Sequence, residues 1–323
     1  MRVLRIALVA GAVACALFLI PIPYIIFGPG AAVDLTRAIT VPGHASPPGR
    51  FYLTDVNLMP GRPFFYAVAK VLPGYEIIRR QELVPPSVSD RQLNLALIDA
   101  MTESQTNAQI VAERAAGLPV LARSSFVVVR IVPRSPGARC FRVGDQIEAV
   151  DGALLQNANT LPAATAAKPL GTRFQLAVRR GNGKLQLSCA TFSFQGKPRF
   201  GITGTFQTQA YSLPVHVVFH IVNINGSSAG LMFALQIYRT LTNKDIASGM
   251  DVAGTGVLAA DGTVGPIEGA REKVRAATRA RARIFFVPAS NYADIKNTPH
   301  IRVIPVRTFQ AALDALEKSQ LSQ

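Results

Sequence analysis

The sequence predicts a multidomain protein with an N-terminal transmembrane helix, a β-rich domain and a C-terminal α/β (α+β) domain. Three observations predict this fold class. An uncharged apolar run lies near the start, the middle third has short strands separated by Gly, Pro and Asp turns, and strands and helices alternate in the last third. The 323 residues and the apolar content of 49% suffice for two or three folded cores.

The first 27 residues predict a membrane anchor. Arg2 and Arg5 precede an uncharged stretch, Ile6–Phe27, whose length suits a membrane span of roughly 20 residues. We favour an uncleaved anchor over a cleaved signal peptide, because the cleavage-like segment Ala12–Ala14 lies inside the apolar run. The basic N-terminus predicts a single-pass cell-membrane protein whose folded domains are extracytoplasmic.

The charge and the cysteines set limits on partners. The net charge of +15 comes from 34 Lys and Arg that are scattered, with no like-charge run longer than two residues, so we expect solvated faces and no nucleic-acid partner. The sequence leaves open whether Cys140 and Cys189 pair. The histidines form no metal-ligand cluster, and we expect neither a metal nor another cofactor.

The region after the anchor predicts an independent domain or a spacer that packs on its neighbours. Residues Phe51–Leu58 alternate with period two, which indicates a strand, and the pattern from Asp90 to Ala116 is helical. The predicted domain boundaries are 1–27 for the stub and anchor, 28–121 for this extracytoplasmic region, 122–195 for the β-rich domain and 196–319 for the C-terminal domain.

The β-rich domain has a recognisable pattern of strands and turns. Strands are expected at Phe126–Val132, Gln146–Val150 and Phe174–Arg179. Together with Ser-Pro-Gly-Ala at 135–138 and Phe-Arg-Val-Gly-Asp at 141–145, this region resembles a PDZ domain of the bacterial protease-associated kind. The resemblance implies binding of extended peptides by addition of a strand to a sheet edge. The alternative is a small β-domain without peptide binding.

The C-terminal domain contains a serine that has two interpretations. The small-residue turn Gly226–Gly230 opens directly into an apolar helix that extends to Leu241. Ser228 could cap that helix, or it could be a nucleophile beside free backbone N–H groups. Glycines at 226 and 230 would let a substrate carbonyl approach the backbone closely. No histidine lies in an evident partner motif, so a lysine is the candidate base.

One lysine is expected to be buried. The segment Gly269–Arg281 predicts a helix in which three arginines form one charged stripe: Arg271, Arg275 and Arg279. Lys273 lies roughly 160° from the first two. Its neighbours three, four and seven residues further on are all alanine: Ala276, Ala277 and Ala280. Burial on this face would lower the pKa of the lysine and favour its neutral form. Alone, Lys273 could equally be a solvated or snorkelling lysine.

Three sequence blocks in order resemble the proteolytic domain of Lon-type serine peptidases: Gly226–Gly230, Asp251–Gly256 and Gly262–Lys273. The resemblance spans about Thr203 to Leu316. It implies that Ser228 is the nucleophile, that Lys273 is the general base and that Thr255 helps to hold the amine. It also implies that Gly226, Ser227 and Ala229 support the nucleophile and the oxyanion region.

The full layout is similar to bacterial membrane-anchored PDZ–Lon-like proteases. Two positions depart from the family pattern. Ser227 stands where proline is usual, and Val257 stands where the ATP-dependent branch has an acid. The sequence has no Gly-x-x-x-x-Gly-Lys-Ser/Thr motif, so we expect an ATP-independent endopeptidase acting on unfolded or flexible proteins and peptides. A possible homo-oligomer is implied by the resemblance alone. A silent PDZ scaffold and a partner-activated protease are the alternatives.

Overall fold

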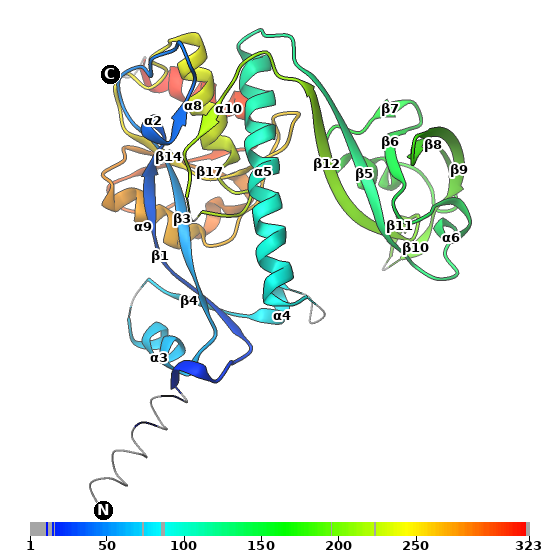
Figure 1. The fold of residues 1–323 in the computed structure, drawn as a ribbon, viewed down its shortest axis with the longest axis horizontal. Coiled ribbons are helices and arrows are strands. Elements are labelled where there is room, and N and C mark those ends of the chain that lie inside the picture. Colours follow the sequence, from blue (N-terminus) through cyan, green and yellow to red (C-terminus); the bar gives the residue numbers. More distant parts are fainter. Residues whose placement is uncertain are drawn as a thin grey trace, which may run out of the picture. The chain divides into compact units, whose positions relative to one another are not determined.

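The computed structural model describes residues 11, 15, 17–72, 74–84, 88–194, 196–222 and 224–320. The chain divides into two compact units (Figure 1). Unit 1 contains residues 1–104, 217–258 and 264–323, and unit 2 contains residues 105–216 and 259–263. The division differs from the predicted boundaries, because segments from the predicted N-terminal region and the C-terminal domain share unit 1.

The sheet of unit 1 joins segments from both ends of the chain (Figure 1). Its order is β18-β17-β14-β3-β1-β4, and the strands are β1 (Tyr24–Asp34), β3 (Phe51–Pro60), β4 (Glu76–Arg79), β14 (Val252–Gly254), β17 (Ile284–Pro288) and β18 (Arg302–Val306). Strand β3 pairs in parallel with β14 and antiparallel with β1. The strand predicted at 51–58 is therefore confirmed, and it lies near the middle of this sheet.

The predicted transmembrane helix is contradicted by the structure. Residues 6–10, 12–14 and 16 of the predicted span lie outside the described residues. From Tyr24 the apolar run is strand β1, in which Ile26 and Phe27 are buried between β3 and β4. Among the residues that the structure describes, no helix is long and apolar enough to cross a membrane. The predicted single-pass membrane location is contradicted with it.

Several helices of unit 1 contact the strands of its sheet. They are α2 (Leu35–Ala38), α3 (Pro63–Val71), α4 (Arg80–Leu83), α8 (Gly230–Thr242), α9 (Ala270–Arg279) and α10 (Phe309–Gln320), with the 3-10 helix η1 (Ala289–Asp294). Helix α9 packs on β1 and β3. One core cluster is built by β14, β17, α9 and the segment after η1, with Phe285, Val274 and Ile295 among its buried members.

Arg239 fastens helix α8 to the N-terminal part of the chain. Its side chain is fully buried, and its guanidinium donates hydrogen bonds to the carbonyl oxygens of Pro47, Pro48 and Gly49, at 3.1 Å for Gly49. The guanidinium carbon also lies 4.4 Å from the centre of the Phe51 ring. Burial lowers the pKa of Arg239. A buried charge of this kind is tolerated because both terminal nitrogens of the guanidinium donate to backbone acceptors, although the buried Nε has no partner among the described residues.

Two further elements connect sequence pattern to structure. Helix α5 (Asp90–Ala115) confirms the helix predicted from Asp90 and runs from unit 1 into unit 2. Residues 214–222 form an alternating apolar stretch, but within it β13 contains only Val218–Phe219 and pairs with β2 (Ile39–Thr40). The alternating apolar pattern there exceeds the length over which a partner strand is present.

Unit 2 contains an antiparallel sheet in the order β12-β5-β6-β8-β9, with β7 beside β6. Its elements are β5 (Leu121–Ile131), α6 (Gly137–Cys140), β6 (Gln146–Val150), β7 (Ala153–Leu154), α7 (Thr160–Ala166), β8 (Arg173–Arg180), β9 (Gly183–Ala190), the hairpin β10 (Phe192–Phe194) and β11 (Lys197–Arg199), and β12 (Ile202–Ser212). The three strands predicted in this region are confirmed. Phe141, Phe174 and Phe200 pack edge to face in the core.

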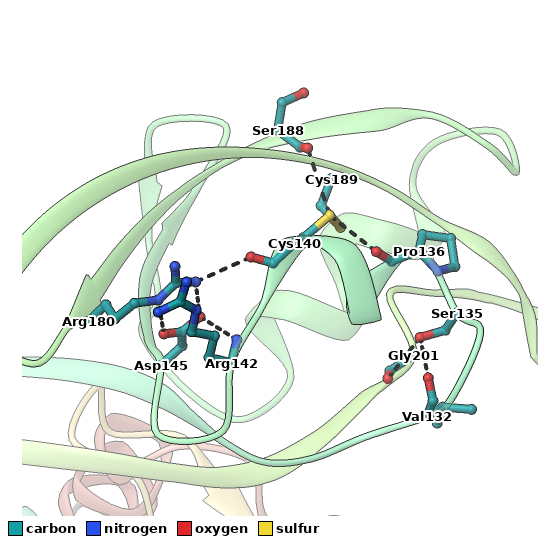
Figure 2. Close-up of a disulfide and its surroundings, with 10 residues drawn as sticks. All are labelled: Val132, Ser135, Pro136, Cys140, Arg142, Asp145, Arg180, Ser188, Cys189 and Gly201. Carbon is teal, nitrogen blue, oxygen red and sulfur yellow. Dashed lines mark hydrogen bonds and ion pairs between the residues drawn. A yellow bond between two sulfur atoms is a disulfide. The ribbon is translucent and has the colours of Figure 1, made fainter.

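A disulfide and an ion pair fix the turn between β5 and β6 (Figure 2). Cys140 and Cys189 are bonded, which resolves the pairing that the sequence left open. Arg180 binds the buried carboxylate of Asp145 with two hydrogen bonds of 2.7 and 2.8 Å. Burial by itself raises the pKa of Asp145, but the hydrogen bonds from Arg180 and from the backbone N–H of Arg142 outweigh it and lower that pKa.

Candidate active site

The turn that carries Ser228 is held by helix α5. The backbone N–H of Gly226 donates to the carbonyl oxygen of Leu97 at 2.9 Å, and Gly226 has a φ of 98°, which favours glycine. The buried Ser104 hydroxyl donates to the carbonyl oxygen of Ser227 at 3.1 Å. Helix α5 thereby fixes both residues that precede Ser228.

Ser228 does not cap helix α8. The N-cap residue is Ala229, and no side chain makes a capping hydrogen bond there. The Ser228 hydroxyl oxygen instead accepts a hydrogen bond from Nζ of Lys273 at 2.7 Å. This contact excludes the interpretation of Ser228 as a helix cap, because the hydroxyl is directed toward a lysine on another element.

Lys273 reaches Ser228 from the inner face of α9. The lysine is only 3% exposed, and its helical neighbours Ala276 and Ala277 are buried with it. Burial lowers the pKa of Lys273 from its ordinary 10.5 to about 8, although the charges of Asp55 and Glu268 raise it in part. A substantial fraction of the amine is therefore neutral in mildly alkaline solution, as a general base requires.

Thr255 joins the lysine to the serine turn. Its hydroxyl oxygen accepts a hydrogen bond of 3.3 Å from Nζ of Lys273, and its hydroxyl donates to the carbonyl oxygen of Ser228 at 3.1 Å. That carbonyl also accepts the N–H of Gly256 at 2.7 Å. Thr255 is fully buried at the end of β14. The structure thus brings Ser228, Lys273 and Thr255 together, as the sequence predicted.

Of the backbone N–H groups around Ser228, one is occupied by a hydrogen bond within the protein and two meet no protein acceptor. The N–H of Gly226 is occupied by Leu97, so it is not free to bind a substrate. In the described part of the chain, the N–H groups of Ser228 and Ala229 meet no protein acceptor. Unpaired N–H groups at a helix start suit a developing oxyanion. No group of three His, Cys, Asp or Glu side chains among the described residues could hold a metal ion.

Sequence reasoning missed the residues that support the site from the N-terminal part of the chain. The Thr54 hydroxyl on β3 donates to the carbonyl oxygen of Gly254, directly before Thr255, at 3.2 Å. Asp55 follows it and influences the pKa of Lys273. Ser104 on α5 holds the serine turn. The alternating pattern at 51–58 indicated a strand, but only the pairing of β3 with β14 places it beside the site.

A family model describes the C-terminal part of the chain. Residues 186–316 match the Lon protease (S16) C-terminal proteolytic domain. This part of the chain is therefore similar to the serine peptidase domain of Lon proteases. The chain is 34% identical over 120 residues to the Lon protease of Neorickettsia sennetsu, a match covering 36% of this chain and 14% of that protein. It is 40% identical over 100 residues to Lon protease 1 of Herpetosiphon aurantiacus, covering 31% and 12%. The matches span less than a fifth of each of these two relatives.

Solved structures similar to this chain include PDZ domains. The PDZ domain of the SdrC-like protein from Listeria monocytogenes is 21% identical, with a TM-score of 0.24, and the match covers 24% of this chain and 85% of that domain. The corresponding domain from Listeria innocua is also 21% identical with a TM-score of 0.24, covering 25% and 92%.

Proposed function

We propose that the chain is an ATP-independent serine endopeptidase with a Ser-Lys dyad. Nζ of Lys273 removes the proton from Ser228 as its Oγ attacks the scissile carbonyl carbon. The backbone N–H groups of Ser228 and Ala229 bind the oxyanion of the tetrahedral intermediate. The protonated lysine then gives its proton to the leaving amine. Water hydrolyses the acyl-enzyme, with the neutral lysine again acting as base.

One observation carries this proposal. A lysine that is 3% exposed, and whose pKa is lowered to about 8, donates to a serine hydroxyl at 2.7 Å. A merely structural lysine would be expected to meet a carboxylate, or to extend its ammonium to solvent. Lys273 instead meets two hydroxyl oxygens, which accept a hydrogen bond from either form of the amine.

The substrates we propose are unfolded proteins and flexible segments. The chain contains no P-loop motif that would mark an ATPase motor for unfolding. Selection would come from the PDZ-like sheet of unit 2, which could receive an extended peptide along an edge strand. The proposal for substrate choice rests on the sequence resemblance of residues 122–195.

The test is peptide-bond cleavage of an unfolded model protein by the full chain without nucleotide, scored by mass spectrometry. Ser228→Ala and Lys273→Ala should each abolish cleavage. Ser290→Ala and Lys244→Ala are matched controls, since both side chains are exposed in the same unit. Equal cleavage by all five proteins would refute the dyad.

Two other results would favour the alternatives. If the unaltered chain does not cleave at any concentration, but gains activity when a binding protein is added, it is a partner-activated protease. If it binds peptides without cleaving them under all conditions, it is a PDZ scaffold. Activity that rises more steeply than protein concentration would indicate a homo-oligomeric active form.

A further inference from the structure

The outer face of α9 borders a pocket that the peptidase chemistry does not use. The pocket has a volume of about 660 Å³ and lies within unit 1. One wall is α9, another is the segment 293–299, which includes the end of η1, and Pro29 and Gly74 also line the pocket. Lys273 does not line it, because that side chain extends from the opposite face of the helix to Ser228.

Positive charge dominates the pocket. Its cationic side chains are Arg271, Arg275, Arg279 and Lys296, and all four are exposed. Its acidic side chains are Glu272 and Asp294. Four positive and two negative groups leave a balance of two positive charges, counted on the lining residues alone. A ligand with about two negative charges would neutralise this surface.

The protein itself compensates this charge only in part. Arg275 lies 3.8 Å from the carboxylate of Glu272, and Arg279 donates to the carbonyl oxygen of Gly30 at 2.8 Å. Within the part of the chain that the structure describes, Arg271 and Lys296 make no ion pair. The charge of Arg271 does act on the carboxyl group of Glu76, where it opposes the rise in pKa that burial causes. Arg271 and Lys296 are therefore not held in an ion pair and can bind an anionic ligand.

Helix stability does not account for the arginine stripe. Like charges four residues apart on a helix repel one another, and the stripe contains two such pairs. Arg271 lies in the first turn of α9, where the helix dipole disfavours a cation. Only Arg279, in the last turn, is placed favourably with respect to the dipole. An arrangement that is unfavourable by itself is consistent with a binding role.

We propose that this pocket binds a small oligoanion, a molecule with two or more phosphate or carboxylate groups. An arginine guanidinium binds either group with two parallel hydrogen bonds. Side chains on successive turns lie about 5–6 Å apart at Cβ, which allows neighbouring arginines to hold neighbouring anionic groups. The volume falls within the range of about 300–1,000 Å³ that is typical of small-molecule sites.

The test is calorimetric titration of the full chain with inorganic tripolyphosphate in one arm and citrate in the other, at roughly 0.1 M salt. We expect one site per chain, and the arm with the tighter binding identifies the anionic group. Arg271→Gln should weaken binding by about tenfold or more, because a charge-assisted pair of hydrogen bonds is lost. Arg283→Gln is the matched control, an exposed arginine of unit 1 outside the pocket, and should leave the affinity unchanged.

Hydrogen exchange locates the site independently of affinity. Bound tripolyphosphate or citrate should slow exchange in α9 and in residues 293–299 relative to the rest of unit 1. If Arg271→Gln lowers the thermal midpoint, Lys296→Gln provides a second variant, since Lys296 is exposed and lies in a loop-like segment.

Three results would overturn the proposal. The first is absence of binding by either anion at millimolar concentration. The second is an equal loss of affinity in Arg283→Gln and Arg271→Gln, which would mean diffuse attraction to a basic surface. The third is binding of an oligoglutamate peptide when neither small anion binds, which would make this face a protein contact. None of these results depends on whether the dyad is active.

Discussion

Replacing Lys273 with methionine should make the folded chain more stable at neutral pH while it removes the proposed base. The side chain is 3% exposed, and its folded-state pKa is about 8 against an ordinary 10.5. Methionine has a similar length and needs no proton, so it can occupy the same space without the desolvation of an ammonium.

The magnitude follows from the two pKa values. Between pH 8 and 10.5 the unfolded chain binds more protons at Lys273 than the folded chain, so stability rises with pH across that window. Below about pH 8 the full cost of the buried lysine is present, roughly 3 kcal/mol. Loss of the hydrogen bonds to Ser228 and Thr255 offsets about 1 kcal/mol or more of the gain. The net stabilisation expected at pH 7 is roughly 1–2 kcal/mol.

The assay is urea unfolding of the full chain followed by circular dichroism at pH 7, 8 and 9.5. The difference in unfolding free energy between Lys273→Met and the unaltered protein should fall by about 2 kcal/mol from pH 7 to pH 9.5. Lys244→Met, at an exposed lysine of the same unit, should show no such change. A difference that stays constant with pH would refute the reasoning, because it would mean that Lys273 titrates alike in both states.

Four further outcomes are expected. Cleavage should rise about fivefold from pH 7 to pH 8 and less than twofold above it, as Lys273 loses its proton with a pKa of about 8; a flat profile would exclude it as the base. Ser104→Ala should lower kcat by about tenfold with KM unchanged, and a change in KM alone would contradict a positioning role. Arg239→Met should lower the unfolding free energy by about 2–4 kcal/mol, measured by urea unfolding, because three carbonyls lose their donor. Replacing Cys140 with serine and Cys189 with alanine should lower the unfolding free energy of unit 2 by about 3–4 kcal/mol for a separation of 49 residues, and hydrogen exchange confined to unit 2 would measure it.

The sequence predicted structure correctly where the local pattern of residues matched the burial that the structure shows. The arginine stripe on the helix that begins at Ala270 left the opposite face for Lys273, and the alanines beside it predicted the burial that the structure shows. The glycine-flanked turn predicted a helix start at Ser228, and α8 begins two residues later. These features depend on the 3.6-residue period of a helix, which a single sequence records directly.

The N-terminal apolar run shows where pattern alone was insufficient. An uncharged stretch of this length is equally compatible with a lipid environment and with a protein core, because both exclude water. Strand β1 buries Ile26 and Phe27 between two partner strands, which lie outside its own segment of the sequence. Hydropathy measures the need for burial but does not identify the partner.

By itself, the sequence determined several local elements, among them α5, α9 and the strand at 51–58, and the residue types of the proposed dyad. Only the tertiary structure decided that Thr54 and Ser104 would support it, that Gly226 would give its N–H to Leu97, and that the two cysteines would be bonded. Local elements follow from periodicity within a few residues. Contacts between segments separated by tens to about two hundred residues depend on which strands pair. That pairing is decided by how the whole unit packs and buries its apolar side chains.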